Sequence, residues 1–200
     1  MESSDKDQRK KKINEVKTFS VPFSLRENQE NLAINKNTPS NPSKEQIINQ
    51  ACKFHLQGNI LKATKYYKYC IEKGFEDYRI FCNYGGILKD IGKTSEAEFS
   101  LRKAIELKPD FAESYSNLGI ILKDLGRLQE AKISLQKAIK LKPDFAESYS
   151  NLGVILKDLG ELREAEISLR KAVELKPEFA ESHANLGNIL SDLGKLEEAE

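Results

Sequence analysis

Residues 108–141 read KPDFAESYSNLGIILKDLGRLQEAKISLQKAIKL, and residues 142–175 read KPDFAESYSNLGVILKDLGELREAEISLRKAVEL. The two stretches are each 34 residues long and differ at seven positions. Two of the differences exchange Ile and Val, which is typical of packed sites. The other five change charge or polarity, which indicates helix surface in contact with solvent. The chain is therefore built from a repeated unit, and the repeat decides its fold.

Each unit has the apolar spacing of two helices. Across residues 112–125, and again across 128–141, apolar side chains recur every three or four positions, as on a helix with one buried face. Gly126 separates the two segments, and Pro143 ends the second because proline cannot continue a helix. The small residues of these faces are Gly119, Ala131 and Ala138. They let paired helices approach closely, and the remaining apolar surface predicts that successive pairs stack into a solenoid.

The unit resembles the tetratricopeptide repeat. That repeat has an aromatic residue at position 4, Leu-Gly at 7 and 8, Gly at 15, Ala at 20, a large apolar residue at 24, Ala at 27 and Pro at 32. With position 1 at Ala112, the matching residues are Tyr115, Leu118, Gly119, Gly126, Ala131, Leu135, Ala138 and Pro143. The following unit supplies Tyr149, Leu152, Gly153, Gly160, Ala165, Leu169, Ala172 and Pro177, and the preceding one Phe81, Tyr84, Gly85, Gly92, Ala97, Leu101, Ala104 and Pro109. The resemblance implies an all-α fold, a right-handed superhelical solenoid of antiparallel helix pairs.

The same register divides the whole chain. The expected parts are a disordered polar tail (1–43), a degenerate first repeat (44–77), three repeats (78–111, 112–145 and 146–179) and an incomplete last repeat (180–200). The tail has too few apolar residues to offset the entropy of ordering it. The alternative for the tail is a docking or targeting arm that uses its basic run at residues 9–12.

The last repeat stops early in its second helix. We expect the apolar face of its first helix, which contains Leu186, Ile189 and Leu190, to lack its covering helix. A solenoid normally ends in a polar-faced cap. This predicts that the chain is a fragment of a longer protein, or that another molecule covers its end.

Position 6 of the first helix is asparagine in every unit. The residues, each 34 apart, are Asn49, Asn83, Asn117, Asn151 and Asn185. Asparagine is a poor residue for a helix interior, so a role at this position is indicated. The resemblance extends to the superhelical domain of O-GlcNAc transferases, whose similar asparagine ladder implies binding to the backbone of an extended peptide. The alternative is that duplication copied the residue along with the repeat, and that it bonds to the neighbouring helix pair.

Lysine and aspartate recur at positions 12 and 13 and are secondary candidates for the same concave face. The residues are Lys89, Asp90, Lys123, Asp124, Lys157 and Asp158. The simpler interpretation is a solvated helix end. The cationic residues that co-chaperone repeats use at positions 5 and 9 to bind a terminal carboxylate are missing, which disfavours that class of ligand.

Charge and hydropathy exclude several other classes. Lysine plus arginine (32) nearly cancels aspartate plus glutamate (31), and a net charge of +1 gives no indication of nucleic acid. No apolar run approaches the roughly 18 residues of a membrane span. Residues 1–12 are charged and lack the apolar stretch of a secretory signal. We therefore expect a cytoplasmic protein that does not bind membranes.

The sequence predicts no catalytic residue, cofactor or metal. Cys52, Cys70 and Cys82 contain no C-x-x-C pair, which disfavours a disulfide framework or a zinc site. Cys70 replaces a buried alanine of the repeat, whereas Cys52 and Cys82 are expected to be more exposed. His55 and His183 lie far apart and have no partners at metal-ligand spacing.

Three functions remain. The first is an interaction scaffold that binds an extended peptide or a partner protein on its concave face. The second is the N-terminal substrate-recognition part of a larger enzyme, by resemblance a glycosyltransferase of the O-GlcNAc transferase type. The third is a structural or oligomerising repeat protein that self-associates through the exposed ends of its solenoid. Because one repeat architecture hosts many functions, the resemblance alone does not choose among them.

Overall fold

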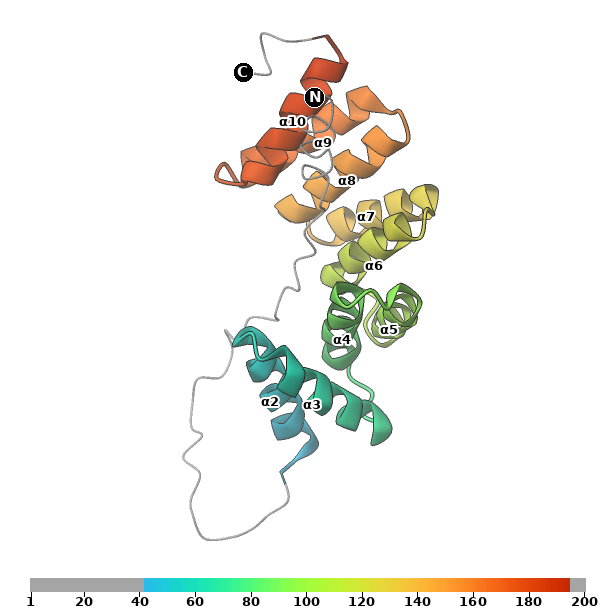
Figure 1. The fold of residues 1–200 in the computed structure, drawn as a ribbon, viewed down its shortest axis with the longest axis vertical. Coiled ribbons are helices and arrows are strands. Elements are labelled where there is room, and N and C mark those ends of the chain that lie inside the picture. The colour runs from blue at the N-terminus through green and yellow to red at the C-terminus, as the bar shows by residue number, and fades with distance from the viewer. Residues whose placement is uncertain (1–41, 195–200) are drawn as a thin grey trace, which may run out of the picture. The chain divides into compact units, whose positions relative to one another are not determined.

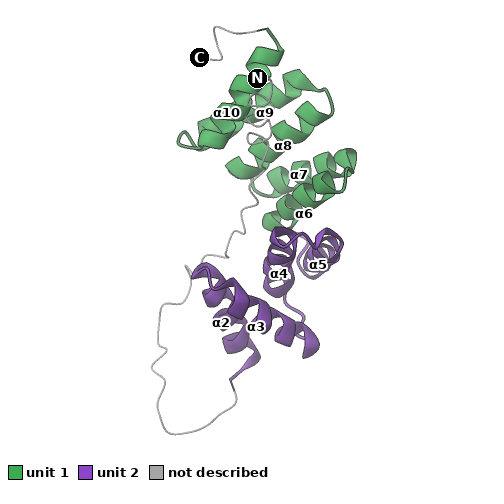
Figure 2. Ribbon diagram, in the orientation of Figure 1, with its two compact units in different colours: residues 1–19, 110–200 green, residues 20–109 purple. Residues whose placement is uncertain are grey.

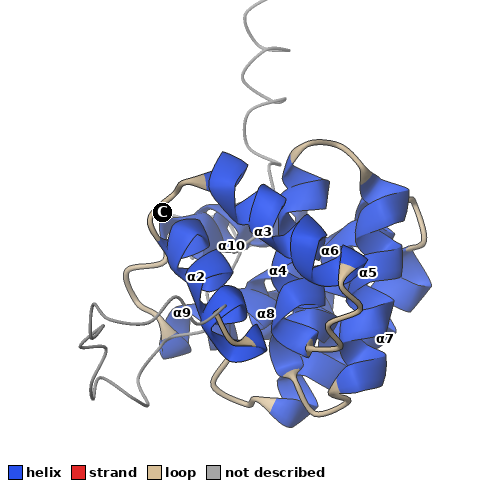
Figure 3. Cartoon of the chain, turned by 90° about the horizontal axis from the view of Figure 1, so that it is seen from below, coloured by secondary structure: helices blue, strands red, loops and turns tan. Residues whose placement is uncertain are grey.

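The computed structural model describes residues 42–194, which are helical apart from short connections and contain no strand (Figures 1 and 3). The helices of this part of the chain are α2 (Lys44–Leu56), α3 (Ile60–Glu72), α4 (Tyr78–Asp90), α5 (Thr94–Leu107), α6 (Ala112–Asp124), α7 (Leu128–Leu141), α8 (Ala146–Asp158), α9 (Leu162–Leu175) and α10 (Ala180–Asp192). The expected all-α repeat fold is confirmed. Residues 1–41, which make up nearly all of the expected tail, and residues 195–200 of the last repeat lie outside the described residues.

The described residues fall into two compact units, coloured separately in Figure 2. The N-terminal unit (residues 42–109) contains α2 to α5, and the C-terminal unit (residues 110–194) contains α6 to α10. In both, consecutive helices pack as antiparallel pairs: α2 with α3, α4 with α5, α6 with α7 and α8 with α9.

A glycine turn joins the two helices of each pair. After α6, Gly126 has a φ of 74°, a left-handed conformation that residues with a Cβ rarely adopt. The amide of Gly126 donates to the carbonyl of Lys123, and the amide of Arg127 donates to that of Leu122, both at 2.8 Å. These two bonds satisfy carbonyls that the helix end would otherwise leave unpaired. The repeated glycine thus allows the chain to turn from the first helix of a unit into the second.

Close packing within a pair depends on a second glycine. A Cβ placed at Gly119 would lie 2.7 Å from Cγ of Leu135, and one at Gly153 would lie 2.5 Å from Cγ of Leu169. Ala131 and Ala138, on the facing helix α7, are fully buried. The leucine of the second helix therefore occupies the space that a larger side chain on the first helix would need.

Helix pairs stack asymmetrically in the C-terminal unit. The first helix of the middle pair, α8, packs against both α6 and α10, and the second helices α7 and α9 pack against the first helix that follows them. Within residues 110–194 the backbones of α7 and α9 do not come together. The first helices are thus more closely spaced, so the unit curves toward them. We call the side formed by α6, α8 and α10 the inner face, and the side formed by α7 and α9 the outer face.

The end of the described stack differs from the expectation. Ile189 is 1% exposed and Leu190 is 2% exposed, and α10 packs against α9. The prediction that these residues lack cover is wrong, because α10 is also covered by α9, the second helix of the preceding pair. Leu186 is half-buried.

Candidate peptide-binding face

The asparagine column occupies equivalent places on the first helices. Four of its members have little exposed surface: Asn83 (5%), Asn117 (7%), Asn151 (6%) and Asn185 (9%). Asn49 is half-buried. Because α6, α8 and α10 are neighbours, the last three asparagines follow one another along the inner face of the C-terminal unit.

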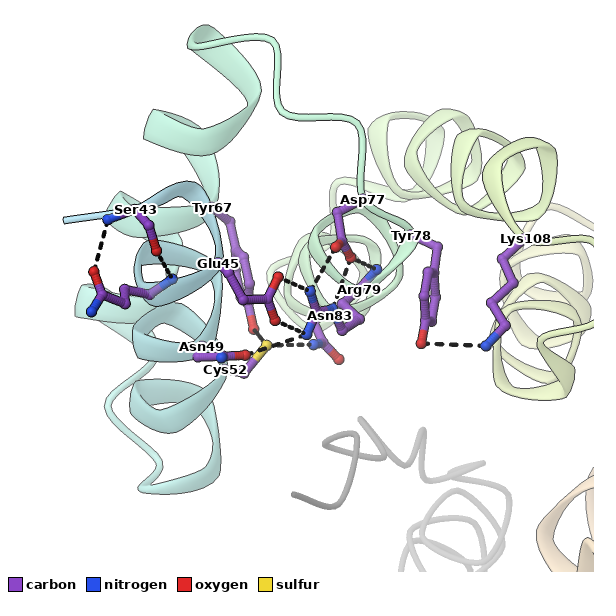
Figure 4. A network of polar contacts seen from close by, with 11 residues as sticks. Ser43, Glu45, Asn49, Cys52, Tyr67, Asp77, Tyr78, Arg79, Asn83 and Lys108 are labelled. Atoms are coloured by element: carbon purple, nitrogen blue, oxygen red, sulfur yellow. Dashed lines mark hydrogen bonds and ion pairs between the residues drawn. The ribbon is translucent and has the colours of Figure 1, made fainter. Parts of the chain in front are cut away.

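In the N-terminal unit, an arginine holds the first asparagine (Figure 4). The Arg79 guanidinium donates to both carboxylate oxygens of Glu45 at 2.9 and 2.8 Å, and to Oδ1 of Asn49 at 3.3 Å. It also donates to both oxygens of Asp77 at 2.9 and 2.7 Å. Such two-pronged contacts fix an arginine in one orientation. Part of the hydrogen-bonding capacity of Asn49 is therefore used within the protein.

The same arginine changes the ionisation of its partners. Its hydrogen bonds and charge hold the pKa of the Glu45 carboxyl below its usual value. Burial opposes ionisation of Asp77, but the bonds from Arg79 outweigh it, so the pKa of Asp77 is also lowered. The hydrogen bonds that Arg79 donates to the carboxylates of Asp77 and Glu45 raise the pKa of Arg79. All three groups are charged at neutral pH.

The second asparagine contacts a cysteine. Nδ2 of Asn83 donates to Sγ of Cys52 over 3.6 Å, and the Tyr67 hydroxyl donates to the same sulfur over 3.8 Å (Figure 4). The Tyr67 hydroxyl also lies 3.4 Å from Nδ1 of His55. Burial lowers the pKa of His55 and raises that of the Cys52 thiol. This cluster is therefore uncharged at neutral pH, and it holds Asn83 in place.

All three cysteines are buried, and none of them is in a disulfide. Cys52 is 5% exposed and Cys82 is 3% exposed, so the expectation that they are more exposed is wrong. Both lie on first helices, and Cys52 contacts Asn83 of the next repeat. Cys70 is fully buried, as its alanine-like position predicts, and burial raises its pKa to about 11.

The asparagines of α8 and α10 have different surroundings. Within residues 42–194, neither Asn151 nor Asn185 makes a side-chain hydrogen bond. In the same range, the side-chain atoms that are sealed from solvent without a partner are Oγ of Ser114 and Oγ of Ser182. The amide groups of Asn151 and Asn185 therefore retain contact with solvent, although most of each residue is buried. A polar group in this state can exchange water for a ligand.

Ion pairs border these amides. On the N-terminal side of the first helices, Lys142 pairs with Glu113 at 3.0 Å and Lys176 pairs with Glu147 at 2.9 Å. The spacing of 29 residues recurs in both repeats, which is a signal that the sequence analysis missed. Each lysine also lies over a phenylalanine ring: Lys142 over Phe145 at 4.6 Å and Lys176 over Phe179 at 5.0 Å. These lysines thus close each repeat onto itself.

The predicted lysine–aspartate residues join neighbouring first helices. Lys123 lies 4.0 Å from Oδ2 of Asp158, and Lys157 lies 3.1 Å from Oδ2 of Asp192. In the N-terminal unit Lys89 lies 3.7 Å from Asp90, and in the C-terminal unit Asp124 is exposed. The pairs neutralise charge at the C-terminal ends of the first helices.

A stripe of four residues on one side of α8 forms part of the inner face. Glu147, Asn151, Val154 and Asp158 follow one another at intervals of four, three and four, so they share a side of the helix. The two acidic residues at its ends are paired with lysines. The middle of the stripe is an amide and an apolar side chain. This arrangement suits an uncharged ligand with hydrogen-bonding groups, such as a peptide main chain.

Two further features bear on the kind of protein. Residues 42–194 contain no cluster of three metal-binding side chains. None of the helices in this range combines the length and the apolar composition needed to cross a bilayer.

The fold and this face define a helical-repeat protein. Sequence profiles of the TPR repeat match residues 85–126 and 119–160, and profiles of the tetratricopeptide repeat match residues 146–179 and 168–200. Together the matches span residues 85–200, which is more than half of the chain. The chain belongs to the tetratricopeptide repeat family. No curated protein sequence matches it significantly.

Solved structures share the fold. A crystal structure of MamA is 28% identical, with a TM-score of 0.66, over 74% of this chain and 87% of MamA. MamA from Desulfovibrio magneticus RS-1 is 21% identical, with a TM-score of 0.67, over 78% of this chain and 88% of that one. YrrB, described as a TPR protein with an unusual peptide-binding site, is 22% identical, with a TM-score of 0.64, over 78% of this chain and 81% of YrrB. Family and fold are those of a protein-interaction scaffold.

Proposed function

We propose that this chain is a scaffold that binds an extended peptide segment on the inner face of its C-terminal unit. Asn151 and Asn185 bind the peptide main chain, and Asn117 extends the row. The observation that carries the proposal is the state of the first two amides, which have no hydrogen bond within residues 42–194 and remain in contact with solvent.

The chemistry of the amide supports this ligand. A carboxamide offers both a donor and an acceptor, so it can pair with the N–H and C=O of a peptide group whatever the side chain. The neighbouring ion pairs leave no surplus charge beside Asn151, because Glu147 and Asp158 are each paired with a lysine. The proposed ligand is therefore an internal stretch of chain rather than a terminal carboxylate. The lysine–aspartate pairs border the site and hold its helices together.

Magnitudes predict weak and sequence-tolerant binding. Each amide hydrogen bond contributes about 0.5–1.5 kcal/mol net. Two or three of them supply a few kcal/mol, which is comparable to or smaller than the association cost of roughly 4 kcal/mol or more. Contacts that flank the amides, such as one to the half-buried Val154, would add affinity for particular side chains.

The test compares main-chain recognition with other modes of binding. A fluorescein-labelled, uncharged peptide of about 12 residues, long enough to span the first helices when extended, is titrated by fluorescence anisotropy. We expect the Asn151→Ala/Asn185→Ala variant to bind more weakly, and we expect backbone N-methylation of the peptide to weaken binding to the wild type. Gln129→Ala, which removes an exposed amide from the outer helix α7, is the matched control. Equal affinity for the wild type and the double variant, or indifference to N-methylation, would contradict the proposal.

A further inference from the structure

The two nearly identical repeats differ mainly on their outer face. All five differences that change charge or polarity lie in α7 and α9 or in the turns before them: Arg127/Glu161, Gln129/Arg163, Lys132/Glu166, Gln136/Arg170 and Lys140/Glu174. The last four pairs are spaced by three, four and four residues, so they form one stripe along each helix. The inner stripes of α6 and α8 differ only by Ile120/Val154. The outer stripe is therefore where the two repeats acquire different surface chemistry.

The charge of the two outer helices differs. Helix α7 contains Lys132, Lys137 and Lys140 against Glu130, which is three minus one and gives +2. Helix α9 contains three cationic and three acidic residues, which gives zero.

Ion pairing leaves this difference in place. On α9, Arg170 pairs with Glu166 at 3.0 Å and Lys171 pairs with Glu174 at 2.6 Å, so the helix neutralises itself. On α7 the acidic residue is already bound by Arg127 in the preceding turn, and Lys132 is bound to Glu161 in the next repeat. Lys137 and Lys140 are exposed and form no ion pair with any residue in the range 42–194. They supply the surplus positive charge.

An exposed apolar side chain lies in the middle of this surface. Ile133 is 65% exposed and is followed by Lys137 and Lys140 at four and seven residues, so the three share one side of α7. Gln129 and Gln136 lie beside it, and both are exposed. We call these five residues the α7 surface. The residue of α9 that corresponds to Ile133 is Ile167, which is 70% exposed and lies on a helix whose net charge is zero.

We propose that the α7 surface is a second docking site, which binds an acidic segment of a partner protein that also carries an apolar side chain. The apolar side chain packs on Ile133, and carboxylates pair with Lys137 and Lys140. Charge complementarity selects this partner, because a basic or neutral segment gains nothing from the two lysines. The site lies on the outer face and does not use the asparagines of the inner face, so it is independent of the function proposed above.

The test uses an acidic probe and two matched variants. The probe is a fluorescein-labelled helical peptide with leucines three or four residues apart and glutamates between them, titrated by anisotropy in low salt. We expect Ile133→Ser/Lys137→Gln to weaken its binding about tenfold, the sum of a small apolar contact and one exposed ion pair. Ile167→Ser/Lys171→Gln makes the same changes on α9 and is expected to leave affinity within about twofold. Added salt should also weaken binding to the wild type.

Other outcomes would overturn the proposal. They are no measurable binding of the probe, equal binding of a peptide with lysine in place of glutamate, or equal losses from the α7 and α9 variants. Tighter binding to vesicles containing phosphatidylserine than to the probe would assign the surface to membranes instead. The Asn151→Ala/Asn185→Ala variant should bind the acidic probe as the wild type does, so this result is separate from the inner-face test.

Discussion

The two units place the same asparagine in opposite situations. In the N-terminal unit, Asn49 accepts a hydrogen bond from Arg79, and Asn83 donates one to Cys52. In the C-terminal unit, Asn151 and Asn185 have no side-chain hydrogen bond within residues 42–194. The column looks uniform in the sequence, but the structure gives Asn49 and Asn83 hydrogen-bond partners that Asn151 and Asn185 do not have within residues 42–194.

One residue type accounts for much of the difference. Position 2 is glutamate in the C-terminal repeats, where Glu113 and Glu147 pair with the lysine that closes their own repeat. In residues 78–111 the same position is Arg79, which reaches back to Glu45 and Asn49 in the preceding repeat. The closing lysine, Lys108, lies instead over the Tyr78 ring at 4.5 Å. Residue 79 thus contacts the preceding repeat, whereas Glu113 and Glu147 contact their own repeats.

The largest expected loss of stability should be common to both units, because the two helices of a pair pack alike in each unit. A Cβ at Gly85 would meet Leu101 at 2.8 Å, as one at Gly153 would meet Leu169 at 2.5 Å. We expect Gly85→Val and Gly153→Val each to lower the free energy of unfolding by about 1–3 kcal/mol or more through overpacking. Urea denaturation followed by circular dichroism measures this. A marked effect in one unit only would show that the pairs are packed differently.

Removal of the Arg79 side chain should lower the stability of the N-terminal unit. Arg79→Ala removes the side-chain partner of the partly buried Asp77, which keeps only the bond from the main-chain amide of residue 79, at an expected cost of about 1–3 kcal/mol. The analogous truncation in the C-terminal unit, Glu147→Ala, removes a more exposed pair and should cost about 1 kcal/mol or less. Equal costs would mean that the Arg79 contacts contribute no more than an ordinary surface pair.

Acid should remove the stabilisation that Arg79 provides through its ion pairs. The folded-state pKa values of Glu45 and Asp77 are lowered, so their contribution to stability is fully present above the usual carboxylate pKa of about 4. It is lost as the pH falls through the lowered values. The difference in melting temperature between the wild type and Arg79→Ala should therefore be largest near neutral pH and shrink below about pH 4. A difference that stays constant down to pH 2 would contradict this assignment.

Peptide binding should depend on the C-terminal asparagines. We expect Asn151→Ala/Asn185→Ala to lower affinity for the uncharged peptide about tenfold, the loss of two hydrogen bonds. Asn49→Ala/Asn83→Ala, the matched pair in the N-terminal unit, should lower it about twofold or less, because those amides already have partners. Anisotropy titrations give both affinities. A larger loss from the N-terminal variant than from the C-terminal one would contradict the prediction.

The smallest expected change in peptide affinity comes from a variant that introduces the Arg79 contact into the C-terminal unit. An arginine in place of Glu147 would lie 34 residues after Glu113 and 30 after Asn117, as Arg79 lies after Glu45 and Asn49. We expect Glu147→Arg to bind Asn117 and to weaken peptide binding by about threefold. Glu147→Gln, which also removes the ion pair with Lys176 but adds no guanidinium, is the control. If both variants behave alike, the contact at Asn117 does not compete with the ligand.

Local features were predictable because each is encoded within one repeat. The period of 34 residues, the glycine of the turn and the glycine that faces a leucine could all be identified from residues 108–141. Predictions failed on burial, which depends on how separate helices pack together. Cys52 and Cys82 were expected to be more exposed, and Ile189 and Leu190 to be uncovered, yet all four are buried.

The sequence by itself determined the helix pairs, their turns and the register of the asparagine column, because each depends on residues at most one repeat apart and recurs in every copy. The tertiary structure decided which asparagines have partners and which lysines on α7 remain unpaired. Those outcomes depend on side chains that meet only when repeats stack, such as Arg79 with Asn49 and Lys132 with Glu161. Hydrogen bonds and ion pairs act over a few ångströms, so a pattern along the chain indicates which groups are present, and the packing of neighbouring repeats determines which of them meet.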